Sequence, residues 1–392
     1  MSSSTHPFRG EILRSIRSGA PPTPTAIARL AEGHTATLGA EGRTTAVSAL
    51  TNQLVGMGPL TPLAEDPAVT DLLVNGDGTV WVDRGAGVVQ AGLRLPCGDL
   101  RPLAVRLAGL AGRRLDDAQP WVDGVLPGGV RLHALLPPLA DGGPHLSLRF
   151  ARHRPSGVDT LVALGAASAG MAVVLRALVD AQVSLVVSGG TGAGKTTVLA
   201  ALLAECAPHE RVVVVEDVRE LDPRHPHVVR LQGRSPNVEG RGGVTLVDLV
   251  RQALRMRPDR LVVGEVRGAE VRELLAALNT GHDGGMSTLH ANGPQEVPGR
   301  IEGLAALAGM PRSAVHAQLR GSLHAVVHVS RSGGRRRVDR IGVLSPDPAN
   351  PGTQRVLVAL TGAKGGLQPG PGLDILLDLV PALRSLRREV GC

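Results

Sequence analysis

A glycine-rich segment that ends in a lysine and two threonines carries the clearest chemical signal in the chain. It reads Gly189-Gly190-Thr191-Gly192-Ala193-Gly194-Lys195-Thr196-Thr197 and contains the pattern G-x-x-x-x-G-K-[ST]. Lys195 is one of only two lysines among 392 residues, which makes a chance match rare. The segment therefore predicts a loop that binds the phosphates of a nucleotide.

The elements around this loop agree with that interpretation. The apolar run Leu185–Val187 predicts a strand before it, and Lys195–Glu205 predicts a helix after it. Backbone N–H groups and the helix N-terminus would then surround the phosphate oxygens. Lys195 is expected to reach the β and γ phosphates, and Thr196 to place its hydroxyl on Mg²⁺. ATP and Mg²⁺ are therefore the expected ligands.

Two further apolar runs, Val212–Val215 and Leu261–Val263, lead into carboxylates. Parallel sheets bind ligands at the carboxyl edge of their strands, so these side chains are expected at the nucleotide. Glu265 is predicted to hold the metal ion or orient the attacking water. Glu216 is predicted as the base, or as a residue that contacts the metal ion only through one of its ligands. The sequence does not divide these roles, and Glu220 is a weaker candidate.

The segment Thr280–Asn292 contains two histidines around a glycine-rich turn and a predicted strand, Met286–His290. A single histidine is more often structural, but two of them beside Thr288 in a nucleotide core favour sensing of the γ-phosphate. His290 is a stronger candidate than His282. The two histidines could also bind a metal ion, but the sequence offers no third ligand near them.

Composition narrows the class of protein. Apolar residues make up 43% of the chain, enough for a sizeable core, and the formal net charge is +7. A basic surface suits nucleic acid, an anionic membrane face or acidic partners. The cysteines contain no C-x-x-C pair, which argues against a zinc site or a disulfide framework. The aromatic residues are Phe8, Trp81, Trp121 and Phe150, and the cysteines are Cys97, Cys206 and Cys392.

Neither a leader nor a clean membrane span is predicted. The first 20 residues are polar, and the longest apolar stretch, Leu161–Val179, is interrupted by Arg176. The expected protein is therefore soluble or peripheral.

The pattern along the chain predicts an α/β protein with a small α+β domain before a nucleotide-binding core. The small domain is predicted to contain helices at 46–55 and 103–110, and strands at 69–74, 79–83, 130–136 and 145–150. In the core, helices at 246–255 and 270–279 follow further apolar strands, which predicts a parallel sheet covered on both faces. A last helix, 373–388, is expected to dock on the core, with binding to a membrane surface or to a partner as the alternative. The predicted divisions are a flexible arm 1–45, the small domain 46–150, a hinge 151–165, the core 166–345, and a Pro/Gly-rich linker with the last helix 346–392.

Four segments together resemble the secretion traffic ATPases of type II and type IV secretion and pilus machines. They correspond to the Walker A loop, the acidic box, Walker B and the histidine box of that family: Gly189–Thr197, Glu216–Leu221, Leu254–Gly268 and Thr280–Asn292. In the small domain, Val69–Gly76 and Asp123–Arg131 resemble the tight-adherence pilus branch (CpaF/TadA-like).

The resemblance implies a RecA-like P-loop core in a homohexameric ring, with ATP bound between the small domain and the core. It implies that Arg131 and Arg149 complete the site. It further implies a motor for pilus assembly or secretion that works with a platform protein of the inner membrane, at its cytoplasmic face. Gly285-Met286 departs mildly from the family pattern, and the four-cysteine zinc insertion of one branch is missing.

Two other functions fit parts of the sequence. A RecA-like DNA-translocating ATPase or helicase is favoured by the basic charge. The scarcity of aromatic residues counts against it, because single-strand grooves stack bases on such side chains, so stable nucleic-acid binding is not expected. A nucleotide-binding scaffold without hydrolysis is disfavoured because Glu265, Glu216 and His290 are all present.

Overall fold

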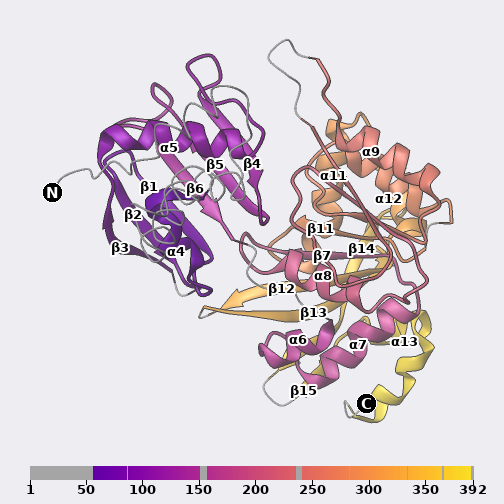
Figure 1. Cartoon of the computed structure of the whole chain (residues 1–392). Helices are drawn as coiled ribbons and strands as arrows, with labels where there is room; N and C mark the ends of the chain where they lie inside the picture. Colours follow the sequence, from indigo (N-terminus) through magenta and orange to yellow (C-terminus); the bar gives the residue numbers. More distant parts are fainter. Residues whose placement is uncertain are drawn as a thin grey trace. The chain divides into compact units, whose positions relative to one another are not determined.

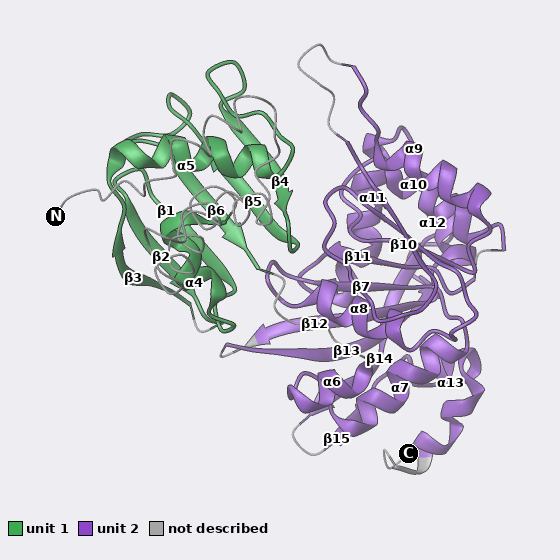
Figure 2. Ribbon diagram, viewed as in Figure 1, with its two compact units in different colours: residues 1–152 green, residues 153–392 purple. Residues whose placement is uncertain are grey.

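The computed structural model describes residues 56–85, 87–150, 157–234, 241–281, 283–332, 334–363 and 366–389. Figure 2 shows two compact units, residues 1–152 and residues 153–392. The arm predicted at 1–45, the helix predicted at 46–55 and the hinge positions 151–156 lie outside the described residues. The rest of the predicted hinge is not a linker, because it contains the helix Val158–Ala163, whose Val158 and Leu161 are buried in the core of unit 2.

Unit 1 is built on a six-stranded antiparallel sheet in the order β3-β2-β1-β6-β5-β4 (Figure 1). Buried and more exposed residues alternate along its inner strands, and the buried ones pack with α5 in one apolar cluster. One face of the sheet therefore forms the core. The elements are η1 (Gly58–Leu60), α4 (Thr61–Glu65), β1 (Asp71–Val74), β2 (Thr79–Asp83), β3 (Val88–Arg94), α5 (Cys97–Leu110), β4 (Trp121–Leu126), β5 (Val130–Leu135) and β6 (His145–Arg149).

Two of these strands, β3 and β4, were not predicted from the sequence. β3 is an edge strand whose residues are all exposed or half-buried, so burial imposes no apolar alternation on it. β4 contains Gly124, where a Cβ atom would lie 2.7 Å from the Cβ of Ala111. The close approach requires glycine there, and glycine weakens the strand pattern. Trp121 and Trp81 both lie on this sheet.

Unit 2 contains a nine-stranded sheet in the order β15-β14-β13-β12-β7-β11-β10-β8-β9. The six strands from β12 to β9 are parallel to one another. Of these, β7, β8, β10 and β11 were predicted, and β9 and β12 were not. β13, β14 and β15 add antiparallel strands at one edge. The strands are β7 (Leu185–Gly189), β8 (Val212–Glu216), β9 (Val228–Gln232), β10 (Arg260–Val263), β11 (Met286–His290), β12 (Ala325–Ser332), β13 (Arg335–Pro346), β14 (Gln354–Ala363) and β15 (Gly366–Pro369).

Helices cover both faces of the parallel strands, so neighbouring residues of one strand enter different cores. In β8, Val212 and Val214 belong to one apolar cluster, and Val213 and Val215 to the other. This is why β8 is an uninterrupted apolar run rather than an alternating one. The helical elements are α6 (Val158–Ala163), α7 (Ala169–Asp180), α8 (Lys195–Ala204), α9 (Leu246–Ala253), η2 (Leu254–Met256), α10 (Glu270–Leu278), η3 (Pro294–Glu296), α11 (Val297–Leu307) and α12 (Arg312–Ser322).

The last part of the chain differs from the expected linker. Residues 346–372 contain β14 and β15, which continue the sheet of unit 2. The predicted helix 373–388 is divided into α13 (Leu373–Leu379), η4 (Pro381–Ser385) and α14 (Leu386–Glu389). Pro381 explains the division, because it lacks an N–H group and disfavours helical geometry at Val380. The segment still docks on the core through buried leucines: Leu373, Leu376, Leu377, Leu383 and Leu386.

Among the described residues, none of the helices is both long enough and apolar enough to cross a membrane. Unit 2 also has an unusual composition, because residues 153–392 contain no Phe, Tyr or Trp.

Candidate active site

The glycine-rich loop connects β7 to α8 and depends on glycine at two positions. A Cβ atom on Gly189 would lie 2.3 Å from the carbonyl oxygen of Val329, so no larger residue fits there. Gly194 caps α8 with φ of +101°, a left-handed conformation that favours glycine. Gly190 has open space on its Cβ side. The loop therefore turns tightly into the helix and leaves backbone accessible to a ligand.

Lys195 is folded back into this loop. Its Nζ donates to Gly189 O at 3.1 Å and to Gly190 O at 3.0 Å, and lies 3.2 Å from His290 Nε2. Burial lowers the pKa of Lys195, while the nearby carboxylate of Glu265 acts against this shift. The ammonium group thus already lies at the loop, held there by carbonyl oxygens and one imidazole.

Glu265 follows β10, and its two carboxylate oxygens have different surroundings. Oε2 accepts from Arg267 at 2.5 Å. Oε1 lies 2.7 Å from His290 Nε2, but the two atoms are not aligned as a hydrogen bond, and Oε1 is buried without another hydrogen-bond partner. A buried carboxylate oxygen that accepts no hydrogen bond from the protein is a suitable acceptor for a water molecule, including one bound to a cation.

His290 ends β11 and presents one nitrogen to two groups of opposite charge. Burial, followed by the charge of Lys195, lowers the pKa of His290, while Glu265 acts to raise it. A bare Nε2 accepts from Lys195 at 3.2 Å, whereas a protonated Nε2 would be attracted to the carboxylate of Glu265, 2.7 Å away. The position of one proton therefore decides which partner His290 binds.

Glu216 ends β8 and lies against the neighbouring strand end. Its Oε1 accepts from the backbone N–H groups of Glu220 and Leu221, both at 3.0 Å. A Cβ atom on Gly264 would come within 2.6 Å of the Glu216 Cγ, so Gly264 makes room for this carboxyl group. Thr196 Oγ1 lies 3.5 Å from Glu220 Oε2. Glu216 thus shapes the acidic segment, and Glu220 faces the threonine of the loop.

Burial raises the pKa of Glu216 to about 7, from an ordinary value of 4.5. The folded state therefore binds this proton more tightly than the unfolded state does. The contribution to stability is present below about pH 4.5 and is lost as the pH rises through about 7.

We expect Glu216→Gln to remove this pH dependence. Between about pH 5 and pH 8, wild-type stability should fall by up to about 3 kcal/mol more than that of the variant. Urea unfolding of the full-length proteins at both pH values gives the free energies of unfolding and therefore this difference. Asp283→Asn, which changes an exposed carboxyl group of the same unit, is the control. Equal pH slopes for wild type and Glu216→Gln would show that Glu216 titrates normally.

The other predicted residues fall into two groups. Thr191, Ala193 and Thr197 lie in the loop or the first turn of α8. Arg131 on β5 and Arg149 on β6 are directly paired across the ladder of unit 1, so the structure brings these two arginines together. Arg149 Nε donates to Asp71 Oδ1 at 3.2 Å. His282 lies outside the described residues.

Three arginines that were not predicted as site residues contact the site. Arg267 binds Glu265, Arg300 Nε donates to His290 O at 3.0 Å, and Arg336 Nε donates to Gly192 O at 3.0 Å. Arg267 could have been found from its position two residues after Glu265. Arg300 lies on α11, 10 residues after His290, and Arg336 lies 144 residues after Gly192. No local pattern marks either arginine.

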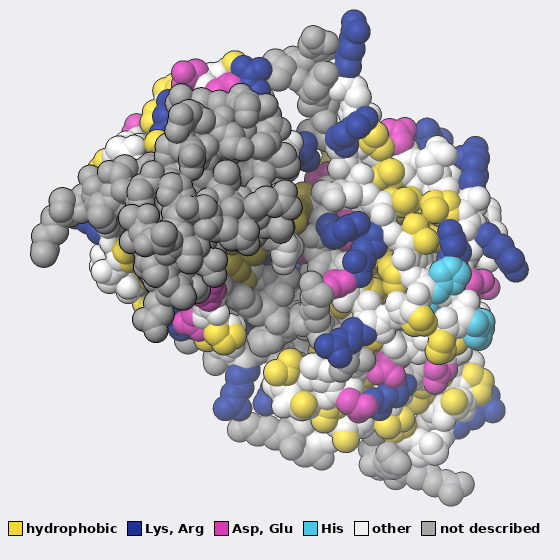
Figure 3. Space-filling model, in the orientation of Figure 1, with side chains coloured by type: hydrophobic (Ala, Val, Ile, Leu, Met, Phe, Trp, Pro, Cys, Tyr) yellow, Lys and Arg dark blue, Asp and Glu magenta, His cyan; other side chains and the backbone are white. Residues whose placement is uncertain are grey.

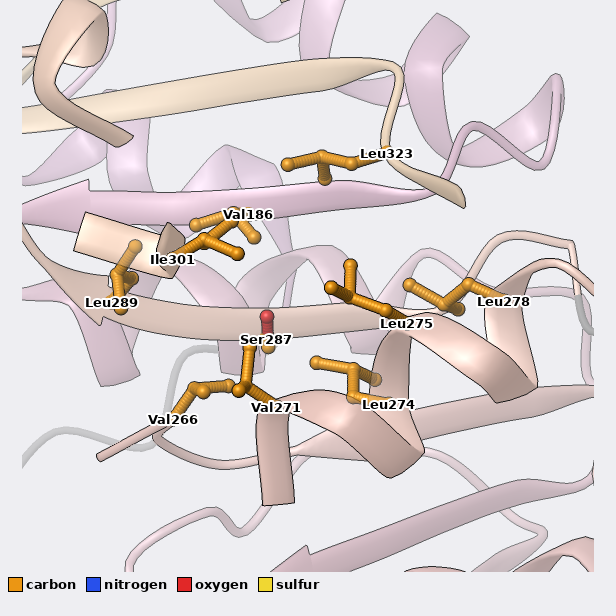
Figure 4. Close-up of a pocket in the computed structure, with 10 residues that line it drawn as sticks. All are labelled: Val186, Val266, Val271, Leu274, Leu275, Leu278, Ser287, Leu289, Ile301 and Leu323. Carbon is orange, nitrogen blue, oxygen red and sulfur yellow. The ribbon is translucent and has the colours of Figure 1, made fainter. Parts of the chain in front are cut away.

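A separate cavity lies beneath α10 (Figure 4). Its lining is apolar apart from Ser287 and contains no titratable group, which does not suit a phosphate ligand. Most of its lining residues belong to one of the two cores of unit 2, so it is a packing gap. The residues around it are Val186, Val266, Val271, Leu274, Leu275, Leu278, Ser287, Leu289, Ile301 and Leu323.

Two observations concern ions and polyanions. Within the described part of the chain, no group of three His, Cys, Asp or Glu side chains is placed to hold a metal ion by itself.

On the face of unit 2 seen in Figure 3, Arg side chains are interspersed with Asp and Glu. That face does not present a continuous basic stripe.

Comparisons with known proteins agree on one family. The profile described as "Type II/IV secretion system protein" matches residues 53–334. The chain is 54% identical over 303 residues to a putative conjugal transfer protein of Mycobacterium tuberculosis (strain CDC 1551 / Oshkosh), covering 75% of this chain and 86% of the relative. It is 33% identical over 302 residues to the type IV secretion system protein PtlH of Bordetella pertussis, a match that covers 69% of this chain and 88% of PtlH.

Solved structures share the fold. The pilus retraction motor PilT, determined with bound ADP, matches with a TM-score of 0.51 and 20% sequence identity, covering 84% of this chain and 88% of that chain. At this identity the match concerns the fold alone. Unit 2 therefore has the RecA-like P-loop fold that the sequence predicted.

Proposed function

Because the chain belongs to the type II/IV secretion system protein family, we propose that this ATPase is a hexameric motor for pilus assembly or secretion. ATP turnover in unit 2 would drive motions of unit 1 that work on a platform protein of the inner membrane. We place the motor at the cytoplasmic face of that membrane. The observation that carries the proposal is the meeting of Lys195, His290 and Glu265 at the phosphate loop.

The first step concerns Lys195. Its ammonium group now binds the carbonyl oxygens of Gly189 and Gly190. Charged phosphate oxygens are stronger acceptors than these neutral carbonyls. ATP would therefore draw Lys195 from the carbonyls toward the β and γ phosphates, while the N–H groups of the loop surround the phosphates.

Release of Lys195 changes His290. Once the ammonium group no longer donates to it, the neutral imidazole of His290 can carry its proton on Nε2 instead of Nδ1 and donate a hydrogen bond from there to Glu265 or to the γ-phosphate. Hydrolysis and loss of the γ-phosphate would reverse this change. His290 would thus sense whether the third phosphate is present, as the sequence suggested.

Glu265 fits the residue that orients the attacking water. Its Oε1 is buried without a hydrogen-bond partner, while Arg267 fixes the other oxygen. Glu216 by contrast uses Oε1 to hold two backbone N–H groups. We therefore propose Glu265 for the water and Glu216 as a positioning residue for the acidic segment.

The residues also fit Mg²⁺. Thr196 supplies a hydroxyl, the Glu265 oxygen suits a metal-bound water, and Glu220 lies beside Thr196. Mg²⁺ held there would neutralise charge on the β and γ phosphates.

We further propose that Arg131 and Arg149 complete the ATP site from unit 1 of a neighbouring copy. Their paired positions on β5 and β6 present two cations on one face of the small sheet. Guanidinium groups stabilise the charge that develops during phosphoryl transfer. In this arrangement each site of the ring takes residues from two copies.

Arg131→Ala is expected to lower turnover by about 10²-fold or more, because the transition state loses a cation. If the arginine acts between copies, a 1:1 mixture of Arg131→Ala and Lys195→Ala chains should regain activity at about a quarter of the sites. Phosphate release before and after mixing measures this. Arg101→Ala, which changes an exposed arginine on α5 paired with Asp117, is the control. A mixture that stays inactive would contradict sharing of sites.

The alternative remains a DNA-translocating ATPase, which similarity to the putative conjugal transfer protein of Mycobacterium tuberculosis favours. The deciding experiment measures phosphate release by the purified full-length chain with and without single-stranded DNA, and its mass in solution with ATP. A hexamer whose turnover is indifferent to DNA supports the secretion or pilus motor. Strong stimulation by DNA would replace it with the translocating ATPase.

A further inference from the structure

The ATP-binding unit lacks the usual side chains for holding a purine base. Proteins commonly stack bases on Phe, Tyr or Trp, and residues 153–392 contain none of the three. A guanidinium group is the other planar surface that stacks on aromatic rings. The arginines near the loop are therefore the candidates for this task.

Two arginines occupy a two-stranded arm beside the phosphate loop. β12 and β13 extend past the neighbouring strands in Figure 1, and Arg331 on β12 is paired directly with Arg336 on β13. Arg336 Nε donates to Gly192 O at 3.0 Å, and a Cβ atom on Gly192 would lie 3.9 Å from an amino nitrogen of Arg331. Both side chains are exposed.

This pairing places two like charges directly opposite each other. Like charges directly opposite each other across an antiparallel ladder repel. Both arginines lie at the loop that is predicted to bind phosphates. Two positive charges there are consistent with a site for an anionic nucleotide. The arm is also held in place, because Ser188 Oγ at the end of β7 lies 2.9 Å from Nδ1 of His328 in β12, both buried.

The arm lies on one side of the phosphate loop, and the residues expected to meet the β and γ phosphates lie on the other side. In the sheet, β12 and β11 lie on opposite sides of β7. Lys195 binds His290 at the end of β11, and Glu265 follows β10 farther along the same side. A nucleotide whose γ-phosphate meets these residues has its nucleoside end free to lie on the flank of β12.

We propose that Arg331 and Arg336 clamp the nucleoside end of ATP, with a guanidinium plane stacked on the base. This inference rests on the proposed ATP site. The hydrogen bond from Arg336 to Gly192 uses the edge of the guanidinium plane and leaves its faces available for stacking. Arg331 lies directly opposite Arg336 on the ladder and supplies a second guanidinium plane at the same end of the nucleotide.

The test compares ligands with and without a base. Calorimetry measures the affinities of ATP, ADP and inorganic tripolyphosphate, each with Mg²⁺, for the wild type and for Arg336→Ala. We expect Arg336→Ala to lower the affinities for ATP and ADP by about tenfold and to leave the affinity for tripolyphosphate within about twofold of the wild-type value. Arg331→Ala should act in the same direction, and Arg336→Lys should not restore ATP affinity, because lysine has no planar group to stack.

Arg337→Ala is the matched control, because Arg337 is the exposed neighbour of Arg336 and points to the opposite face of β13. Unchanged ATP affinity in Arg336→Ala overturns the clamp, and so does an equal loss for ATP and tripolyphosphate. Full rescue by Arg336→Lys overturns the stacking. Lys195→Ala distinguishes the two proposals, since it should weaken ATP and tripolyphosphate together. If it weakens neither, the ATP site itself is wrong.

Discussion

Lys195→Ala is expected to lower ATP turnover by about 10³-fold or more, because the loop loses the cation that meets the charge developing on the phosphates. The side chain is buried, and it binds the loop and His290 at once. Its removal therefore also leaves His290 facing Glu265 alone. Phosphate release at saturating ATP measures the loss.

The chain offers a matched control for this variant. Lys364 is the only other lysine in the sequence, so Lys364→Ala removes the same chemical group outside the loop. It should leave turnover within about twofold of wild type. Wild-type turnover in Lys195→Ala would remove the basis for an ATPase site at this loop.

Glu265→Gln is expected to bind ATP about as well as the wild type and to hydrolyse it about 10²- to 10³-fold more slowly. The amide has nearly the shape of the carboxylate but lacks the charge that orients water and pairs with Arg267. Equilibrium dialysis gives the ATP affinity, and single-turnover hydrolysis gives the rate. The separation of binding from turnover is the signature of a group that acts in the chemical step.

Glu273→Gln is the control, since Glu273 lies on α10 in the same unit and pairs with Arg251. Normal hydrolysis in Glu265→Gln would transfer the role to Glu216. In that case the pH dependence of turnover should follow the raised pKa of Glu216, with activity increasing as the pH rises through about 7.

The parallel strands of unit 2 could be predicted because burial on both faces leaves uninterrupted apolar runs. β8, β10 and β11 begin and end within a residue of their predicted bounds. The edge strands could not be predicted in the same way. β15 has no buried residue and therefore carries no core pattern, and the buried positions of β14 do not alternate regularly. The expected end of the core at 345 fails for this reason.

The phosphate loop and its carboxylates could be predicted because each lies next to a recognisable strand. The local pattern also gave His290, at the end of β11. The contacts of Arg300 with His290 and of Arg336 with Gly192 could not be predicted. The second contact joins residues 144 positions apart, and the first depends on how α11 packs back on the end of β11. Arginine is also so common here that its presence alone carries no information.

The separation of aromatic residues between the two units has an optical consequence. Both tryptophans, Trp81 and Trp121, lie on the sheet of unit 1, and Trp121 is 47% exposed. The ATP-binding unit has no tryptophan or tyrosine, so it contributes almost nothing to the intrinsic fluorescence of the protein. A change in emission when ATP binds unit 2 therefore reports an event at unit 1. The unmodified protein carries its own probe of the coupling on which a motor depends.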